Sequence, residues 1–300
     1  MLRRLAEYAF NNAYLLLSAM GLFWAGNQVL GRAAAGHIPP IALAFLRWTF
    51  ATAIVLPFAM PHLRRDWPAV RETWPLLAFL GVTGGGAFNT LQYIGLNYTT
   101  ALNSLVLNST APVLIAIACV FLFNDRLTVR QVIGILISMV GVLVVVSRGE
   151  LGVLLTLSLN RGDLLILLGM VTTAIYTAYL RLRPRIEWIT FLFWMFLASA
   201  LFNLPLVLVE MFVFGKIIQP TLFTFLTVGY VSIFPSILAY LFFARGVELI
   251  GGVRAGIFMH LIPLYGALLA IWLLGEPLAL FHVVGFALIL AGVALTSRKP

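Results

Sequence analysis

The sequence predicts an all-α integral membrane protein, with ten transmembrane helices arranged as two inverted five-helix repeats around a central cavity. Three observations lead to this fold class: the composition, an internal repeat and the distribution of basic residues. Of the 300 residues, 62% are apolar and only 10% are charged, which is far outside the range of soluble globular proteins. A single cysteine leaves no basis for a disulfide framework or a cysteine-based metal cluster.

The internal repeat emerges when the sequence is shifted by 151 residues without any gap. Over the 48 positions that begin at Gly95, nine residues then meet an identical residue. The identical pairs are Gly95–Gly246, Pro112–Pro263, Ala116–Ala267, Leu122–Leu273, Leu127–Leu278, Val132–Val283, Gly134–Gly285, Gly141–Gly292 and Val142–Val293. Glycine and proline mark special backbone positions, so their preserved register indicates a duplicated membrane unit.

Uncharged runs of about 20 residues, the length that crosses a bilayer as a helix, place the spans in chain order. The longest run, 52 residues between Glu72 and Asp125, is long enough for two crossings. Asp163 is the expected N-cap of the sixth span. The predicted spans are about residues 11–30, 41–60, 74–93, 99–123 and 129–146, then 163–180, 188–213, 222–243, 252–274 and 278–296.

An odd number of spans per repeat means that the second unit enters the membrane upside down, which is the plan of many secondary transporters. We expect residues 1–147 to form the first repeat, 148–161 an external connector and 162–300 the second repeat, within one membrane domain. With the termini and the loops after even-numbered spans on one side, that side carries fourteen of the eighteen loop and terminal Lys and Arg residues. The positive-inside rule then predicts a multi-pass protein of the cell (inner) membrane with cytoplasmic N- and C-termini.

Several segments carry a family resemblance. They are FWAGNQVLGR, IPPIALAFLRW, GLNYTTALNSLVLNSTAPVLIAIACVFLFNDRLTVRQVIGILISMVGVLVV and, in the second half, ARGVELIGGVRAGIFMHLIPLYGALLAIWLLGEPLALFHVVGFALILAGVAL. Together they resemble the EamA-type repeat of the drug/metabolite transporter (DMT) superfamily. The resemblance covers nearly the whole chain and implies a ten-helix exporter with a cavity between its repeats. Within the superfamily the chain is most similar, by overall likeness, to the YddG-type bacterial amino-acid exporters.

Two prolines at equivalent positions are candidate hinges. Pro112 cannot donate to the carbonyl of Asn108, and Pro263 likewise frees the carbonyl of Met259. The freed carbonyls could hold a substrate ammonium group or a water, and the prolines could bend the helices during alternating access. The alternative is that they only shape kinked, well-packed helices.

His260 is the one ionisable residue that the sequence places close to the bilayer centre. Such a residue is a functional candidate by default, and its titration range suits a proton relay. The alternative is a neutral histidine that hydrogen-bonds a neighbouring helix. All ten acidic residues are expected at span ends or in loops, so facilitated efflux without ion coupling also stays open.

Aromatic and amide side chains in the spans are the candidates for substrate binding. Asn89 and Tyr240 are equivalent under the 151-residue shift and are expected to face each other across the cavity. Arg47 is expected to snorkel or to pair with Glu210, in a structural role. The substrate-binding candidates are Trp24, Asn27, Asn89, Asn108, Tyr176, Tyr179, Tyr240 and His260.

These features predict a secondary transporter that exports small metabolites by alternating access. A cavity of aromatics and amides suits aromatic and other neutral amino acids, because it can hold a zwitterion with an apolar side chain. The alternatives are efflux of drugs or other metabolites and, more remotely, a non-transporting membrane protein or an intramembrane enzyme. No HExxH, GxSxG or phosphate-loop motif occurs, so we expect no enzyme, catalytic residue, metal or cofactor. The expected partners are the substrate and the lipid bilayer, without nucleic acid, and the protein is expected to be a monomer.

Overall fold

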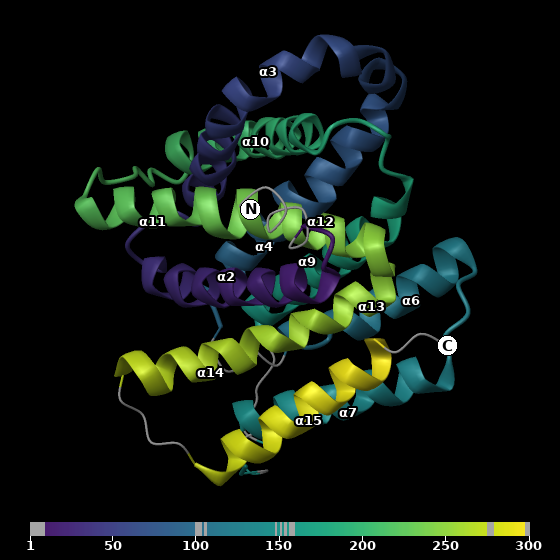
Figure 1. Ribbon diagram of the computed structural model, residues 1–300. Coiled ribbons are helices and arrows are strands. Elements are labelled where there is room, and N and C mark those ends of the chain that lie inside the picture. Colours follow the sequence, from purple (N-terminus) through teal and green to yellow (C-terminus); the bar gives the residue numbers. More distant parts are fainter. Residues whose placement is uncertain are drawn as a thin grey trace, which may run out of the picture.

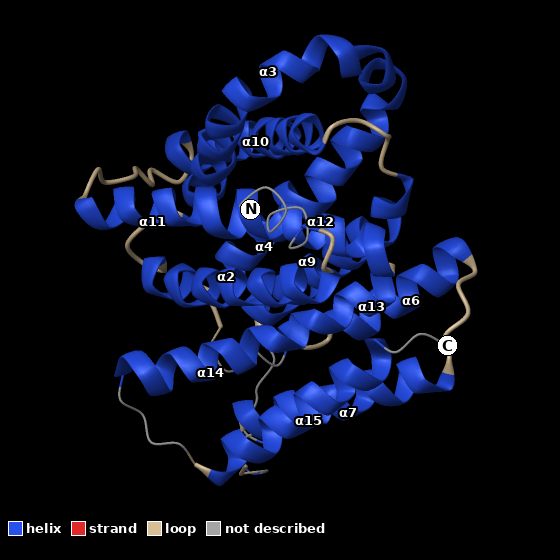
Figure 2. Ribbon diagram, in the orientation of Figure 1, coloured by secondary structure: helices blue, strands red, loops and turns tan. Residues whose placement is uncertain are grey.

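The computed structural model describes residues 10–99, 107–147, 160–274 and 279–297, together with Ser104, Gly149, Glu150, Gly152 and Leu155. Every regular element within these ranges is helical, as Figure 2 shows. The helices in chain order are α2 (Ala13–Ala34), α3 (Pro40–Gly81), η1 (Val82–Ala87), α4 (Phe88–Gly95), α6 (Ala111–Phe123), α7 (Val129–Val146), α9 (Arg161–Tyr179), η2 (Leu180–Leu182), α10 (Trp188–Phe212), α11 (Leu222–Ser232), η3 (Ile233–Leu238), α12 (Ala239–Ile250), α13 (Gly252–Gly256), η4 (Ile257–His260), α14 (Leu261–Leu274) and α15 (Leu280–Ser297).

Most of these helices run roughly along one direction, so their connections gather at two ends of the bundle (Figure 1). The α10–α11 connection lies at the left end, and the α6–α7 connection lies at the right end. Within the described residues, five continuous helical segments are long and apolar enough to cross a membrane, namely Ala13–Ala34, Pro40–Gly95, Arg161–Leu182, Trp188–Phe212 and Leu222–Ile250. The prediction of an all-helical protein with several membrane-crossing helices is therefore confirmed.

The prediction of a loop between the second and third spans is wrong, because α3 continues through this region as a helix. Four prolines lie inside α3, at positions 57, 61, 68 and 75. Each removes a backbone hydrogen bond and bends the helix without ending it. The chain therefore reverses direction through a helical arch, which Figure 1 shows at the top of the molecule, and returns alongside α10.

The helix widens into a π-helical turn at η1, and a second π-helical turn, η3, joins α11 to α12. The two turns start at Val82 and Ile233, which are 151 residues apart, and both are six residues long. In η1, a β-carbon at Gly84 would lie 2.4 Å from the Tyr176 ring, so only glycine allows α9 to approach this closely. Single π-turns inside helices are frequent at functional sites.

The fourth predicted span is interrupted, whereas the ninth, predicted at 252–274, is helical throughout those bounds and changes from α-helix to 3₁₀-helix and back. A turn at Ser109 and Thr110 precedes α6, which places Pro112 in the first turn of a helix, where proline is well tolerated. In the second half, the 3₁₀ segment η4 separates α13 from α14, and Pro263 follows in the first turn of α14. Residues 100–103, 105 and 106 of the predicted fourth span lie outside the described residues.

Helices α7 and α15 lie side by side at the bottom of Figure 1. Their contact is built on glycines that allow the two backbones to touch. A β-carbon at Gly141 would lie 2.8 Å from the Gly285 carbonyl oxygen, and one at Gly292 would lie 2.4 Å from the Gly134 carbonyl oxygen. Small residues are typical of close helix contacts in membranes.

The sixth predicted span begins two residues earlier than expected, and its N-cap is Asn160. The Asn160 side chain accepts hydrogen bonds from the backbone N–H groups of Gly162 (2.7 Å) and Asp163 (3.2 Å). Asp163 returns the interaction by accepting from the Asn160 N–H at 2.8 Å. This reciprocal capping box satisfies N–H groups that a helix start leaves without partners, so Asp163 occupies the third helical position.

Candidate functional site

Arg47 lies at the centre of the bundle, on the first half of α3, with only 1% of its surface exposed. Its guanidinium donates hydrogen bonds to five residues from three other elements. The acceptors are Ser236 Oγ (2.6 Å), Asn89 Oδ1 (2.8 Å), Tyr93 Oη (2.9 Å), Asn27 Oδ1 (3.0 Å) and the Pro235 carbonyl (3.1 Å). All five acceptors are neutral oxygens.

The expected pairing of Arg47 with Glu210 is wrong. Glu210 accepts from the backbone N–H groups of Ile41 (3.3 Å) and Ala42 (2.7 Å), at the start of α3. A carboxylate is favourable there because a helix start presents unpaired N–H groups and a partial positive charge. The sequence did contain a signal for Arg47, since any charge inside an apolar span is a functional candidate.

Asn89 and Tyr240, which were expected to face each other across the cavity, instead touch directly, with the Asn89 side-chain N–H donating to the Tyr240 oxygen at 3.2 Å. The Tyr240 hydroxyl in turn donates to the carbonyl of Gly84, and Asn89 also donates to that of Gly85 at 3.1 Å. Both acceptors belong to the π-helical turn η1. The irregular backbone thus supplies carbonyl oxygens to a buried hydrogen-bonded cluster, which we call the polar centre. It consists of Arg47 with Asn27, Asn89, Tyr93 and Tyr240.

Trp24 and Tyr176 enclose Tyr240. The Trp24 indole N–H donates to the Pro235 carbonyl at 3.0 Å, and its ring centroid lies 5.7 Å from that of Tyr240. The Tyr176 ring lies 6.1 Å from Tyr240. Tyr179 is elsewhere, because its ring packs between those of Phe79 and Phe123.

His260 is fully buried and uses both ring nitrogens. Nδ1 lies 2.7 Å from the hydroxyl of Ser138 on α7, and Nε2 lies 2.8 Å from the carbonyl oxygen of Ser109. A neutral imidazole can satisfy both contacts when Nε2–H donates to the carbonyl and Nδ1 accepts from the hydroxyl. This geometry fits the neutral-histidine alternative, and its Nε2 contact joins the two proline-bearing helices at positions 151 residues apart.

A cavity of about 30 Å³ lies beside the polar centre, and it has room for about one water molecule. Four predicted substrate-binding residues and the hinge residue Pro263 line it, whereas Tyr176, Tyr179, Tyr240, His260 and Pro112 do not. Its walls are formed by Trp24, Asn27, Gln28, Arg47, Phe88, Asn89, Asn108, Ser109, Met170, Met259, Ile262 and Pro263. Small-molecule sites typically have about 300–1,000 Å³, so the centre is closed in this conformation.

A larger cavity of about 270 Å³ adjoins the central one and shares Gln28 and Ile262 with it. Its outer wall includes Arg32, at the end of the bundle where the external loops are predicted. Gln28 and Ser104, which both line this cavity, accept hydrogen bonds from the Gln92 side-chain amide, each at 3.2 Å. This bridge links α2, α4 and the segment before α6.

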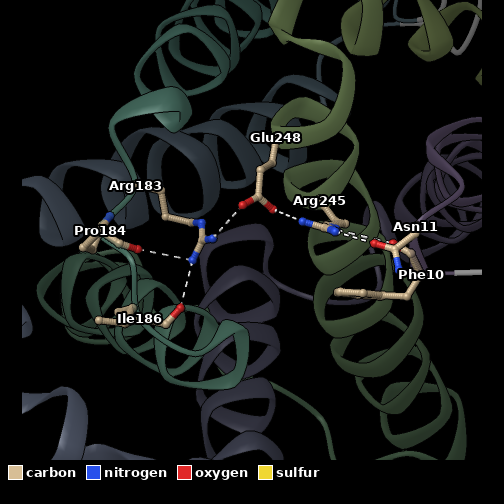
Figure 3. A network of polar contacts seen from close by, with 7 residues as sticks. All are labelled: Phe10, Asn11, Arg183, Pro184, Ile186, Arg245 and Glu248. Atoms are coloured by element: carbon tan, nitrogen blue, oxygen red, sulfur yellow. Dashed lines mark hydrogen bonds and ion pairs between the residues drawn. The ribbon is translucent and has the colours of Figure 1, made fainter. Parts of the chain in front are cut away.

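A cavity of about 470 Å³ lies at the opposite end, with Arg181, Arg183 and Arg185 in its wall. Glu248 also lines this cavity, and it lies between two arginines, as Figure 3 shows. Arg183 donates to the Glu248 carboxylate at 3.3 Å, and Arg245 donates to it at 2.5 Å. Arg183 also donates to the carbonyls of Pro184 (3.3 Å) and Ile186 (3.1 Å), and Arg245 donates to Asn11 Oδ1 (2.6 Å) and the Phe10 carbonyl (3.4 Å). The network therefore ties together the α9–α10 connection, α12 and the chain before α2.

Near this end, Arg181 and Asp125 form a bidentate ion pair, in which two guanidinium nitrogens donate to the two carboxylate oxygens. The hydrogen bond from Arg181 lowers the pKa of the Asp125 carboxyl below its ordinary value, so the pair stays charged at neutral pH. Elsewhere in the described residues, no three His, Cys, Asp or Glu side chains gather as a metal site requires.

Apolar helices that surround a closed polar centre, with a larger cavity toward each end, define a membrane transporter. The chain belongs to the EamA-like transporter family, whose model matches residues 11–147 and again 160–298. This places it in the DMT superfamily.

Curated relatives match over most of their length. The chain is 26% identical over 294 residues to the uncharacterized transporter YyaM of Bacillus subtilis, covering 95% of this chain and 93% of the relative. It is 26% identical to a probable amino-acid metabolite efflux pump of Salmonella typhimurium, covering 90% of this chain and 89% of that protein. A solved crystal structure covers 95% of this chain and 96% of its own, with a TM-score of 0.75 at 21% identity, which shows a shared fold alone.

Proposed function

We propose that this protein is a secondary transporter of the inner membrane that exports aromatic and other neutral amino acids by alternating access. In this it would resemble the YddG-type exporters, with both termini in the cytoplasm. The observation that carries the proposal is the polar centre. It lies where the π-helical turns η1 and η3 approach the two helices that contain Pro112 and Pro263. Interrupted transmembrane helices near the midplane are where secondary transporters bind their substrates.

Contacts between equivalent positions support two inverted repeats, 1–147 and 162–300. Asn89 with Tyr240, and Ser109 with His260, are pairs 151 residues apart that touch directly. The glycine contacts between α7 and α15 are reciprocal, because exchanging the repeats turns the pair 134–292 into the pair 141–285. Such self-complementary contacts are what a two-fold axis produces. Residues 148–161 would then be the external connector.

Alternating access fits a closed centre flanked by two larger cavities. Gln28, which lines both the central cavity and the one at the predicted external end, is held by its hydrogen bond from Gln92. The Arg183–Glu248–Arg245 network ties the helices at the predicted cytoplasmic end. We propose that one closure opens while the other holds, and that the turn before Pro112 and the 3₁₀ segment before Pro263 absorb the movement as hinges.

The lining of the cavity favours an amino acid. Trp24, Phe88 and Met259 offer apolar walls, and Asn27 and Asn89 offer polar groups. The relative named as a probable amino-acid metabolite efflux pump points the same way. Efflux of cationic drugs is less well supported, because the ionisable residue in the wall is an arginine. We propose no enzymatic activity and no cofactor.

The test is solute exchange in proteoliposomes that contain the purified protein. Liposomes loaded with unlabelled phenylalanine should accumulate radiolabelled phenylalanine, leucine and threonine from outside, whereas liposomes loaded with a nucleotide sugar or a cationic dye should not. Protein-free liposomes and an Arg130→Gln variant, altered at an exposed position, are the controls. Exchange of the dye or sugar but of no amino acid would overturn the proposed substrate class.

A further inference from the structure

The guanidinium of Arg47 is a buried positive charge without an anionic partner among the described residues. Burying an unpaired charge is costly, and buried charges are ordinarily paired. Here neutral oxygens take the place of a counter-ion, and Nη1, which carries two hydrogens, has three of them: Asn27, Asn89 and Tyr93. Arg47 also lines the central cavity, so an anion that enters the cavity reaches the charge directly.

A second buried group in the same wall also lacks a partner. Asn108 Oδ1 accepts no hydrogen bond from any described residue, although its amide nitrogen lies 3.4 Å from Ser104 Oγ. A buried acceptor without a donor costs about 1–3 kcal/mol. The cavity therefore presents an unneutralised cation and an unused acceptor, which are the complements of a carboxylate and an ammonium group.

From these observations we propose that Arg47 binds the carboxylate of the substrate and that Asn108 Oδ1 accepts from its ammonium group. This inference rests on the proposed transport function and deepens it, because it defines the substrate class as molecules that carry a carboxylate. A carboxylate can accept two parallel hydrogen bonds from a guanidinium, and such charge-assisted bonds are roughly twice as strong as neutral ones. The substrate therefore displaces some of the neutral oxygens that surround Arg47, and amines without a carboxylate are rejected.

The experiment compares four ligands that differ in their head group only: phenylalanine, 3-phenylpropionate, phenethylamine and phenylalaninamide. Binding to the purified protein is measured by displacement of radiolabelled phenylalanine and by the shift in melting temperature for each ligand. Wild-type protein should bind phenylalanine best and 3-phenylpropionate more weakly, and it should not bind the two compounds that lack a carboxylate. Comparable affinity for phenethylamine and phenylalanine would overturn the proposal without any variant.

Two variants separate the roles. Arg47→Gln should lower affinity for phenylalanine and 3-phenylpropionate together by about 10- to 150-fold, as the loss of a charge-assisted bond predicts. Asn108→Ala should lower affinity for phenylalanine and leave 3-phenylpropionate unchanged. A purely structural role for Arg47 would change stability and not this selectivity. Arg47→Lys replaces Arg47→Gln if the latter does not fold. It keeps the positive charge and loses the paired donors of the guanidinium, so it should bind both carboxylates with at least tenfold lower affinity.

The outcomes distinguish this inference from the proposed function. Unchanged carboxylate affinity in a folded Arg47 variant would overturn the inference and leave amino-acid transport standing. Binding of 3-phenylpropionate that depends on Arg47, without any transport of amino acids, would support the carboxylate site and refute the amino-acid assignment. Failure of every carboxylate to bind the wild-type protein would overturn both.

Discussion

The network around Glu248 predicts how the protein can be biased toward opening at the predicted cytoplasmic end. Glu248→Gln removes the carboxylate that joins Arg183 to Arg245 and keeps the size of the side chain. Both arginines retain other acceptors, at Pro184 and Ile186 for Arg183 and at Asn11 for Arg245. The substitution therefore weakens the link between the α9–α10 connection and α12 without leaving a guanidinium unpaired.

The size of the effect follows from exposure. The Glu248 side chain is 42% exposed, whereas those of Arg183 and Arg245 are 11% and 19% exposed. Ion pairs with this much solvent contact contribute about 0.2–1 kcal/mol each, and the longer one, at 3.3 Å, lies at the lower end of that range. Loss of both ion pairs should shift the equilibrium between the closed and open states of the predicted cytoplasmic end by about 1 kcal/mol. This is about a fivefold increase in the population of the open state.

The assay uses the rate at which a cysteine in the cavity reacts with a polar maleimide. Cys119, the single native cysteine, is replaced by alanine, and a new cysteine is placed at Val247 in the wall of the 470 Å³ cavity. Glu248→Gln should raise the rate there about fivefold and leave the rate of a cysteine at Val29, in the opposite cavity, no higher. Glu150→Gln, an exposed change of the same charge, is the control. An equal rise at both positions would mean that the fold has loosened, and no rise at Val247 would refute a closing role for the network.

Three further predictions concern the site and the packing. Trp24→Ala should reduce transport of phenylalanine more than that of threonine, because burial of an aromatic ring contributes about 25 cal/mol per Å²; equal losses in proteoliposome uptake would assign the residue to packing. His260→Gln should leave the pH dependence of transport unchanged and cost about 1–3 kcal/mol of stability, because one ring nitrogen contacts Ser138 on α7 and the other contacts the carbonyl of Ser109; loss of pH-driven accumulation at unchanged thermal stability would instead identify a proton relay. Gly141→Leu should lower the melting temperature markedly, because a β-carbon there would lie 2.8 Å from the Gly285 carbonyl oxygen, whereas the same change at Gly152, where nothing lies within 4 Å, should have little effect.

The contact between Asn89 and Tyr240 was predictable because the shift of 151 residues that aligns the two copies of the repeat also aligns these two residues. Once Gly141 and Gly292 are aligned by a shift of 151 residues, an inverted arrangement requires equivalent positions near the axis to meet. The contact between Asn89 and Tyr240 follows from that rule alone. Nothing about the local sequence around either residue was needed.

Features that depend on how a helix responds to proline were not predictable in the same way. The prolines of α3 bend a continuous helix, whereas a turn precedes Pro112 and a 3₁₀ segment precedes Pro263. A proline removes one hydrogen bond in every case, and the outcome depends on what replaces it. Beside the carbonyl of Asn108, to which Pro112 cannot donate, the carbonyl of Ser109 contacts His260 from the other half of the chain, and no local pattern records that contact.

Arg47 illustrates the same limit, because the partners of a buried charge are set by tertiary structure. Its acceptors come from α2, α4 and η3, so the guanidinium connects elements of both halves of the chain. A substrate can shift a conformational equilibrium only through contacts that differ between the two states. If a carboxylate replaces some of these acceptors, binding itself loosens the ties between the halves. The residue that recognises the substrate would then also transmit its arrival to the helices that must move, which explains why a charge is retained where a neutral side chain would be less costly to bury.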